Sequence, residues 1–229
     1  MNKESNLYTI IYSIIVVVIV AVMLAYTSEA LHPLQARNIA IDKIRQLLTS
    51  INIESTHSDA EQLFEKYIAD SYLVNLQGEK VPGDALKTEL AGELAKPEAE
   101  RKYPVFEALL DGNKKYILSM RGAGLWGPIW GFIALNDDKN TVYGASFDHE
   151  GETPGLGAEI GMPPFEHEFI GKKFFDPENK FVSIAVVKAG KTAHGQDYVD
   201  GISGGTITSQ AVNDMLKSSI GAYEMFLRK

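Results

Sequence analysis

The stretch from Leu7 to Tyr26 restricts the fold of this chain more than any other part of its sequence. It reads LYTIIYSIIVVVIVAVMLAY, twenty residues without a charged side chain. About 20 apolar residues form a helix long enough to cross roughly 30 Å of membrane hydrocarbon. Tyr8, Tyr12 and Tyr26 lie near its ends, where aromatic rings favour the membrane interface. We therefore expect a membrane-spanning anchor in residues 1–28.

A signal peptide cleaved after residues 28–30 is the alternative. The apolar region of a signal peptide is shorter, about 7–15 residues, so an uncleaved anchor is favoured. The flanking charges bear on orientation: Lys3 precedes the span, whereas Arg37, Lys43 and Arg45 follow it. The positive-inside rule applied to these charges predicts a cytoplasmic C-terminal domain, but long domains cross largely regardless of charge.

Composition limits the remaining classes of protein. The 229 residues suffice for one anchor and one domain, and 45% hydrophobic residues are ample for a core. A net charge of −8 without a basic cluster disfavours nucleic acid as a partner. The absence of cysteine excludes iron–sulfur clusters, disulfides and thiol catalysis within this chain.

The first half of the soluble part reads as helical. Apolar spacing predicts a helix over Pro33–Ile51, with the proline in its first turn. A second helix is expected over Ser58–Leu73, since Ser58 and Glu61 fit a capping box. A third, shorter helix is expected over Asp84–Lys96. Residues 29–114 are accordingly predicted to form a helical juxtamembrane part.

The second half, residues 115–229, reads as strands and turns closed by a helix. Apolar and aromatic runs predict strands over Tyr116–Met120, Ile129–Leu135, Thr141–Phe147 and Phe181–Lys188. The polar residues 136–140 predict a hairpin turn. We therefore expect an α+β domain with a mainly antiparallel sheet and flanking helices.

A glycine-rich segment, Asp200–Thr206, precedes the closing helix. Apolar residues follow at helical spacing: Val212, Met215, Leu216, Ile220, Tyr223 and Leu227. Ser and Thr at the helix entry are good N-cap candidates. A helix N-terminus offers free N–H donors and a positive dipole, which suit a phosphate, and the Thr206 hydroxyl can also be esterified to one. The alternative is a turn that only caps the helix.

Two more glycine-rich loops lie in the strand-rich half, Arg121–Pro128 and Gly151–Gly157. Each presents one large apolar side chain, Trp126 and Leu156, which could lie against the two faces of a flat ring. Thr153 could hydrogen-bond the polar edge of such a ring. Taken alone, either loop also fits a turn next to a core side chain.

The pattern Asp-x-x-Ser-Gly-x-Thr in residues 200–206 resembles the flavinylation motif of proteins that carry flavin mononucleotide (FMN) on threonine. In that family a flavin transferase uses FAD as donor, and the resemblance makes Thr206 the acceptor of the FMN phosphate. The family usually has alanine before the acceptor, where this chain has Gly205.

Together, Gly-Leu-Trp, Glu-Thr-Pro-Gly-Leu-Gly and Ser-Gly-x-Thr behind one apolar span resemble the C subunit of the Na+-translocating NADH:quinone oxidoreductase. The resemblance covers nearly the whole chain; the G subunit of the Rnf-type ferredoxin:NAD oxidoreductase shares the architecture. It implies no catalytic residue and no metal site in this chain, and covalent FMN on Thr206. The cofactor-binding positions are Trp126, Glu152, Thr153, Leu156, Gly157, Lys188, Ser203, Gly204 and Gly205.

The resemblance also implies a setting. It describes an electron-transfer subunit of a translocase in the bacterial inner membrane, with the soluble domain on the periplasmic side. Its partners would be flavin- and iron–sulfur-carrying subunits, and a flavin transferase during maturation. Lys188 matches a family lysine near the flavin, where a cation favours the reduced, anionic ring; otherwise it is a solvated lysine at a strand end.

Other interpretations remain open from the residues. A membrane-anchored extracytoplasmic binding protein without flavin, or a free-standing flavoprotein reductase, would fit the same anchor and domain. His149 and His167 each lie between two acidic residues. Neighbouring residues in a strand face opposite ways, and no second ligand set stands at helical spacing, so we do not expect metal.

Overall fold

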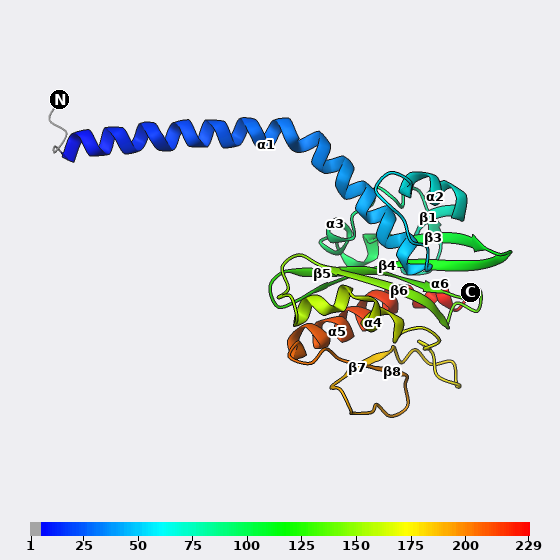
Figure 1. Ribbon diagram of the computed structural model, residues 1–229. Helices are drawn as coiled ribbons and strands as arrows, with labels where there is room; N and C mark the ends of the chain where they lie inside the picture. Colours follow the sequence, from blue (N-terminus) through cyan, green and yellow to red (C-terminus); the bar gives the residue numbers. More distant parts are fainter. Residues whose placement is uncertain (1–5) are drawn as a thin grey trace. The chain divides into compact units, whose positions relative to one another are not determined.

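The computed structural model describes residues 6–229, and Figure 1 shows their helices and strands. Residues 1–5 of the predicted anchor, including Lys3, lie outside the described residues. Contacts divide the chain into two compact units, Met1–Lys43 and Ile44–Lys229. The predicted limits at residues 28 and 114 stay predictions.

One helix, α1 (Asn6–Ser50), contains both the predicted membrane span and the helix predicted after it. Pro33 therefore lies inside a helix rather than in its first turn. An 18-residue window of α1 has a mean hydropathy of 2.8, so α1 is long and apolar enough to cross a membrane. Its last turns belong to the second unit and bury Ile44, Leu47 and Leu48.

A six-stranded antiparallel sheet forms the centre of the second unit. Its strands are β1 (Ile68–Val74), β2 (Lys80–Val81), β3 (Tyr103–Leu110), β4 (Asn113–Ala123), β5 (Pro128–Leu135) and β6 (Val142–His149). Their order is β2-β1-β3-β4-β5-β6, and every neighbouring pair is antiparallel. The predicted strands over residues 116–120 and 129–135 are confirmed within β4 and β5, and β6 begins one residue after the predicted Thr141.

Residues 29–114 were predicted to be helical, but they also contain β1, β2 and β3. Helix α2 (Ala60–Tyr67) begins after Asp59 rather than Ser58, and the chain then enters β1. The predicted helix was therefore wrong beyond Tyr67, because residues 68–74 find hydrogen-bonding partners on β3. Between β2 and β3, the predicted third helix is only α3 (Leu90–Leu94), followed by the short 3-10 turn η1 (Glu98–Glu100).

Side chains alternate between the two faces of the sheet and bury both. One face packs Val105, Leu118, Ile133 and Phe147 into a cluster with the apolar face of α5 (Thr206–Ala222). On the other face the rings of Phe106 and Phe132 lie 6.3 Å apart. The end of α1 covers this second face: a side chain at Gly144 would collide with the carbonyl of Ser50.

The remaining elements lie beyond β6. They are η2 (Gly157–Gly161), α4 (Pro163–His167), β7 (Ala185–Val187), β8 (Tyr198–Asp200), α5 and α6 (Glu224–Leu227). The predicted strand over residues 181–188 is reduced to β7, which pairs in parallel with β8. The predicted apolar stripe of the closing helix is buried as expected. The α+β class with a mainly antiparallel sheet is thus confirmed.

The outer border of β6 is covered by the segment that follows it. The Val142 N–H donates to Lys172 O at 2.8 Å, and Gly171 N–H donates to Val142 O at 2.9 Å. Further along, Phe147 N–H donates to Glu166 Oε1 at 2.8 Å. Burial raises the pKa of Glu166, although this hydrogen bond opposes the shift.

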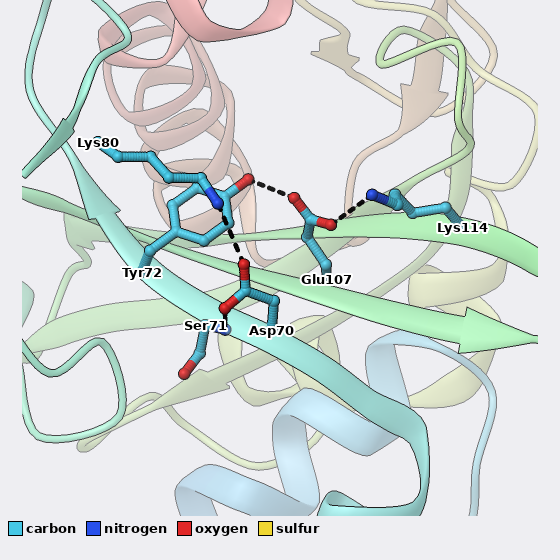
Figure 2. A network of polar contacts seen from close by, with 6 residues as sticks. All are labelled: Asp70, Ser71, Tyr72, Lys80, Glu107 and Lys114. Carbon is cyan, nitrogen blue, oxygen red and sulfur yellow. Dashed lines mark hydrogen bonds and ion pairs between the residues drawn. The ribbon is translucent and has the colours of Figure 1, made fainter.

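At the border opposite β6, a network of polar side chains joins β1, β2, β3 and β4 (Figure 2). The Tyr72 hydroxyl donates to Glu107 Oε1 at 2.6 Å, and Lys114 Nζ donates to Glu107 Oε2 at 2.6 Å. Lys80 lies 3.4 Å from the centre of the Tyr72 ring and contacts Asp70 at 3.1 Å. Burial and the neighbouring Glu107 raise the pKa of Tyr72. This network ties β1, β2, β3 and β4 together.

Candidate cofactor site

The candidate site is built around the N-terminus of α5. Gly205 is the N-cap residue, so the predicted Ser or Thr cap was wrong, and glycine has no side chain to cap the helix. The first N–H groups of a helix have no acceptor within the helix, which leaves donors for a ligand. Gly205 is buried, whereas Thr206, the first helical residue, is exposed.

A tight turn leads into this helix. Gly205 N–H donates to Ile202 O at 3.0 Å, and Gly204 takes a positive φ of 77°. The Ser209 hydroxyl accepts the Ile202 N–H at 2.9 Å, which fixes the turn to the first turn of α5. Gly201 N–H donates to Val187 O at 2.6 Å, which connects the turn to the end of β7.

The turn, the helix start and the end of β7 enclose a cavity of about 270 Å³. Its lining residues are Val186, Val187, Lys188, Ala189, Gly201, Ile202, Ser203, Gly204, Thr206, Ser209 and Gln210. Lys188 is exposed and directly follows β7. A cation, an exposed hydroxyl and a helix N-terminus therefore share one small cavity.

The side chain of Glu152 holds the three glycine-rich segments together. Its Oε1 accepts the backbone N–H groups of Leu125 at 2.7 Å and Trp126 at 3.0 Å. Its Oε2 accepts the Thr208 hydroxyl on α5 at 2.6 Å. Glu152 is buried. Through these hydrogen bonds its single carboxylate joins the β4–β5 loop to the first turn of α5.

The electrostatics of Glu152 favour its charged form. Burial alone would raise the pKa of Glu152, but the hydrogen bonds from Thr208, Trp126 and Leu125 outweigh burial and hold it below its ordinary value. The carboxylate therefore stays ionised at neutral pH. A buried charge with several donors is much better stabilised than an unpaired one.

Glycine is required at two positions around this carboxylate. A Cβ at Gly157 would overlap Glu152 Oε2 and Thr208 Oγ1, and one at Gly124 would crowd Glu152 Oε1. Gly204 also has no room for a side chain, because a Cβ there would lie 2.6 Å from Leu156 Cδ2. The three segments thus pack so closely that a side chain larger than glycine at these positions would collide with a neighbouring segment.

The large apolar side chains of the two loops face solvent. Trp126 exposes 67% of its surface and Leu156 exposes 42%. This exposure argues against the alternative in which each loop only presents a core side chain. Thr153 is also exposed, and its carbonyl accepts the N–H groups of Leu156 and Ala158 at 3.1 Å each.

The structure thus brings most of the predicted site residues together. Contacts join Trp126, Glu152, Leu156, Gly157, Gly204 and Gly205, and the cavity joins Lys188, Ser203, Gly204 and Thr206. Thr153 lies on the same loop as Glu152, with its side chain in solvent.

Sequence reasoning missed two residues, Thr208 and Ser209, whose hydroxyls bond Glu152 and the Ile202 N–H. Their position in the sequence could have indicated this role, because a hydroxyl about one helical turn after Gly204 and Gly205 can bond back to the preceding loop.

The acidic neighbours of the two histidines serve other contacts. Asp148 Oδ2 accepts Gln46 Nε2 at 2.6 Å, and Glu168 Oε2 accepts the Asp200 N–H at 2.7 Å. Among residues 6–229, no group of three or more His, Cys, Asp or Glu side chains is arranged to hold a metal ion.

The residues present fit a phosphate ester attached to a flat ring. The start of α5 offers N–H donors and a hydroxyl for the phosphate, and Lys188 adds a positive charge. Trp126 and Leu156 offer apolar surface for a ring. Flavin mononucleotide has both parts.

Comparisons with known proteins agree with this fit. The FMN-binding domain family matches residues 124–221, which contain the three glycine-rich segments except for residues 121–123 of the first. The C subunit of the Na(+)-translocating NADH-quinone reductase of Vibrio vulnificus is 33% identical over 199 residues, covering 80% of this chain and 78% of the relative. The same subunit of Pseudomonas aeruginosa is 30% identical and covers 99% and 96%.

A solved structure is also similar. The crystal structure of the C subunit of the Na(+)-translocating NADH-quinone reductase from Parabacteroides distasonis is 52% identical, with a TM-score of 0.83. The match covers 87% of this chain and 98% of that chain.

Proposed function

Because the chain belongs to the family of the C subunit of the Na(+)-translocating NADH-quinone reductase, we propose that it carries covalent FMN on Thr206 and relays electrons in such a complex. The observation that carries the proposal is the exposed Thr206 hydroxyl at the start of a helix that has only glycine at its N-cap. FMN, when bound, supplies the capacity to accept and release electrons one at a time.

The proposed attachment is a transfer from FAD. The Thr206 oxygen forms a bond to the phosphorus of the FMN half, the bond between the two phosphates breaks, and AMP leaves. The hydroxyl proton goes to solvent or to a base of the flavin transferase. The exposure of Thr206 favours this proposal, because the transferase must reach the hydroxyl.

The other site residues bind and orient the group. The N–H groups at the start of α5 and the Ser203 hydroxyl would hold the phosphate, and Lys188 would favour negative charge beside it. Trp126 and Leu156 would offer apolar surface to the ring, and Thr153 would offer its hydroxyl to the polar edge of the ring. Glu152, Gly157, Gly204 and Gly205 set the distances between these groups.

The anchor and the tether serve one purpose in this proposal. The span in α1 holds the domain in the inner membrane, with the domain on the periplasmic side, and the covalent bond holds the flavin in the domain. Flavin- and iron–sulfur-carrying partner subunits are then reached without diffusion of a cofactor. No separate substrate site of its own is needed for the relay.

In-gel fluorescence tests the tether. Full-length protein from a host with the flavin transferase should give a fluorescent band on a denaturing gel, and its intact mass should exceed the polypeptide by one FMN less one water. Thr206→Val should abolish both signals. Ser218→Ala, which removes an exposed hydroxyl of the same helix outside the cavity, should keep them. An unmodified wild-type chain would refute the proposal.

Two other functions are distinguished by the same preparations. A ferredoxin-linked Rnf-type complex would show the same fluorescent band but different co-purified subunits. An extracytoplasmic binding protein without flavin would show no fluorescent band, and Trp126 and Leu156 would then serve another ligand.

A further inference from the structure

Gln46 joins two neighbouring strands through its side-chain amide. The Trp130 Nε1–H donates to Gln46 Oε1 at 3.0 Å, and Gln46 Nε2 donates to Asp148 Oδ2 at 2.6 Å. Trp130 on β5 and Asp148 on β6 are paired positions of the sheet. Both groups of the amide are therefore used, and the last turns of α1 are fixed to the end of the β5–β6 ladder.

A polar chain continues from Asp148 to the candidate cofactor site. Asp148 Oδ1 accepts the His149 N–H at 2.8 Å, and His149 Nδ1 accepts the Glu152 N–H at 3.3 Å. The Glu152 carboxylate then accepts the N–H groups of Leu125 and Trp126 and the hydroxyl of Thr208. Successive hydrogen bonds share the residues Asp148, His149 and Glu152.

This series of hydrogen bonds connects the two faces of the sheet. Gln46 and Asp148 lie on the face covered by α1, whereas Glu152 reaches the start of α5, which packs on the opposite face. β6 ends at His149, and the backbone bends at Glu150 and Gly151 before it reaches Glu152. The position of Glu152 therefore depends on where Asp148 and His149 hold the beginning of this bend.

We propose that Gln46 is a positioning residue for the cofactor site, acting through Asp148 and His149 on Glu152 and on the loop that carries Trp126. The proposal rests on the proposed function for its consequence on the flavin. Its structural part concerns only the loops, and so it can be tested in protein without flavin.

Hydrogen exchange of the Leu125 and Trp126 amides tests the structural part in the full-length chain without flavin. Gln46→Leu removes both hydrogen bonds of the amide, and Gln46→Glu places a carboxylate against Asp148. In both variants we expect these two amides to exchange about fivefold to tenfold faster, as expected for losing about one hydrogen bond. Amides within the β3–β4 pair should exchange at the wild-type rate.

Rescue and control variants separate positioning from general stability. The Gln46→Glu/Asp148→Asn double variant restores an amide–carboxylate pair in the reverse order, with an acceptor still facing Trp130 and one facing the His149 N–H. It should return Leu125 and Trp126 exchange to the wild-type rate. Thr49→Val, which removes only a local bond from Thr49 Oγ1 to Arg45 O, should leave exchange unchanged.

Two results would overturn the proposal. One is unchanged exchange of Leu125 and Trp126 in both single variants; the other is an equal acceleration at all sheet amides, which would mean a role in stability alone.

In flavin-loaded protein, the single variants should keep the fluorescent band but shift the flavin midpoint potential, and the double variant should reverse the shift. An unshifted potential would overturn the consequence for the flavin. A wild-type chain without flavin would refute the proposed function, while the exchange result would still decide the role of Gln46.

Discussion

At the scale of single residues, the candidate site depends on one buried carboxylate and on glycines that leave room for it. Glu152 takes donors from two backbone positions and from Thr208, so the loops are held by charge-assisted bonds. From the sequence, Glu152 was expected to bind cofactor. The structure shows it bonded to protein groups, and this function could not be read from the sequence because its donors are far away along the chain.

Gly157→Ala should destabilise the domain by about 1–3 kcal/mol, the usual cost of forcing an extra methyl group into a packed site. The new Cβ would overlap both Glu152 Oε2 and Thr208 Oγ1. Gly92→Ala is the matched control: it meets no neighbour within 4 Å, and in helix α3 alanine should be neutral or stabilising. Urea denaturation measures both, and equal effects would contradict the packing argument.

Glu152→Gln should lower the free energy of unfolding by about 2 kcal/mol at pH 7, because an amide cannot accept all three donors. The pKa of Glu152 is below its ordinary value in the folded state. Its contribution is therefore complete above the unfolded pKa of about 4.3 and is lost as pH falls through the folded pKa.

The difference between wild type and Glu152→Gln should accordingly shrink below about pH 4. Denaturation curves across acidic pH check this, with Glu178→Gln on the exposed loop as control. A difference independent of pH would mean that Glu152 is already protonated in the folded domain.

At the scale of elements, long periodic segments were predictable and short paired ones were not. The helix α5 follows from its buried apolar stripe, and the β5–β6 hairpin follows from its turn. Residues 68–73 were predicted to be helical because the capping signal precedes them. Their state is instead decided by pairing with β3, a partner about 35 residues away that no local pattern reveals.

The network that joins these strands predicts coupling between Tyr72 and Glu107. Tyr72→Phe removes the hydroxyl donor, and Glu107→Leu removes the carboxylate oxygens that accept from Tyr72 and Lys114. Each should destabilise the domain by about 1–2 kcal/mol, and the double variant should lose about 1 kcal/mol less than the sum. Denaturation of all four proteins gives this coupling energy. Strict additivity would show that the 2.6 Å bond contributes nothing measurable.

At the scale of the whole molecule, the anchor and the family were evident from the sequence, but the side of the membrane was not. The span is apolar enough for a membrane, whereas Arg37, Lys43 and Arg45 after it favour a cytoplasmic domain by charge alone. The proposed function instead requires the domain on the periplasmic side.

Thiol labelling decides between these orientations, since the chain has no cysteine of its own. Asp137→Cys places one thiol in the exposed turn between β5 and β6. We expect a membrane-impermeant maleimide to label this variant in cells with a permeabilised outer membrane, and the unmodified chain to take no label. Labelling only after lysis of the inner membrane would assign the domain to the cytoplasm.

The two borders of the central sheet have a consequence for assembly. One border is β2, a strand of two residues, and the other is β6, whose outer groups bond to Gly171, Lys172 and Glu166. Within residues 6–229, β2 pairs only with Leu73 and Val74 of β1, and the outer groups of β6 bond within the domain at Val142 and Phe147, so both borders leave only short unpaired stretches. A short, interrupted edge is a poor template for a strand of another polypeptide, which lowers the tendency of copies crowded in a bilayer to join edge to edge.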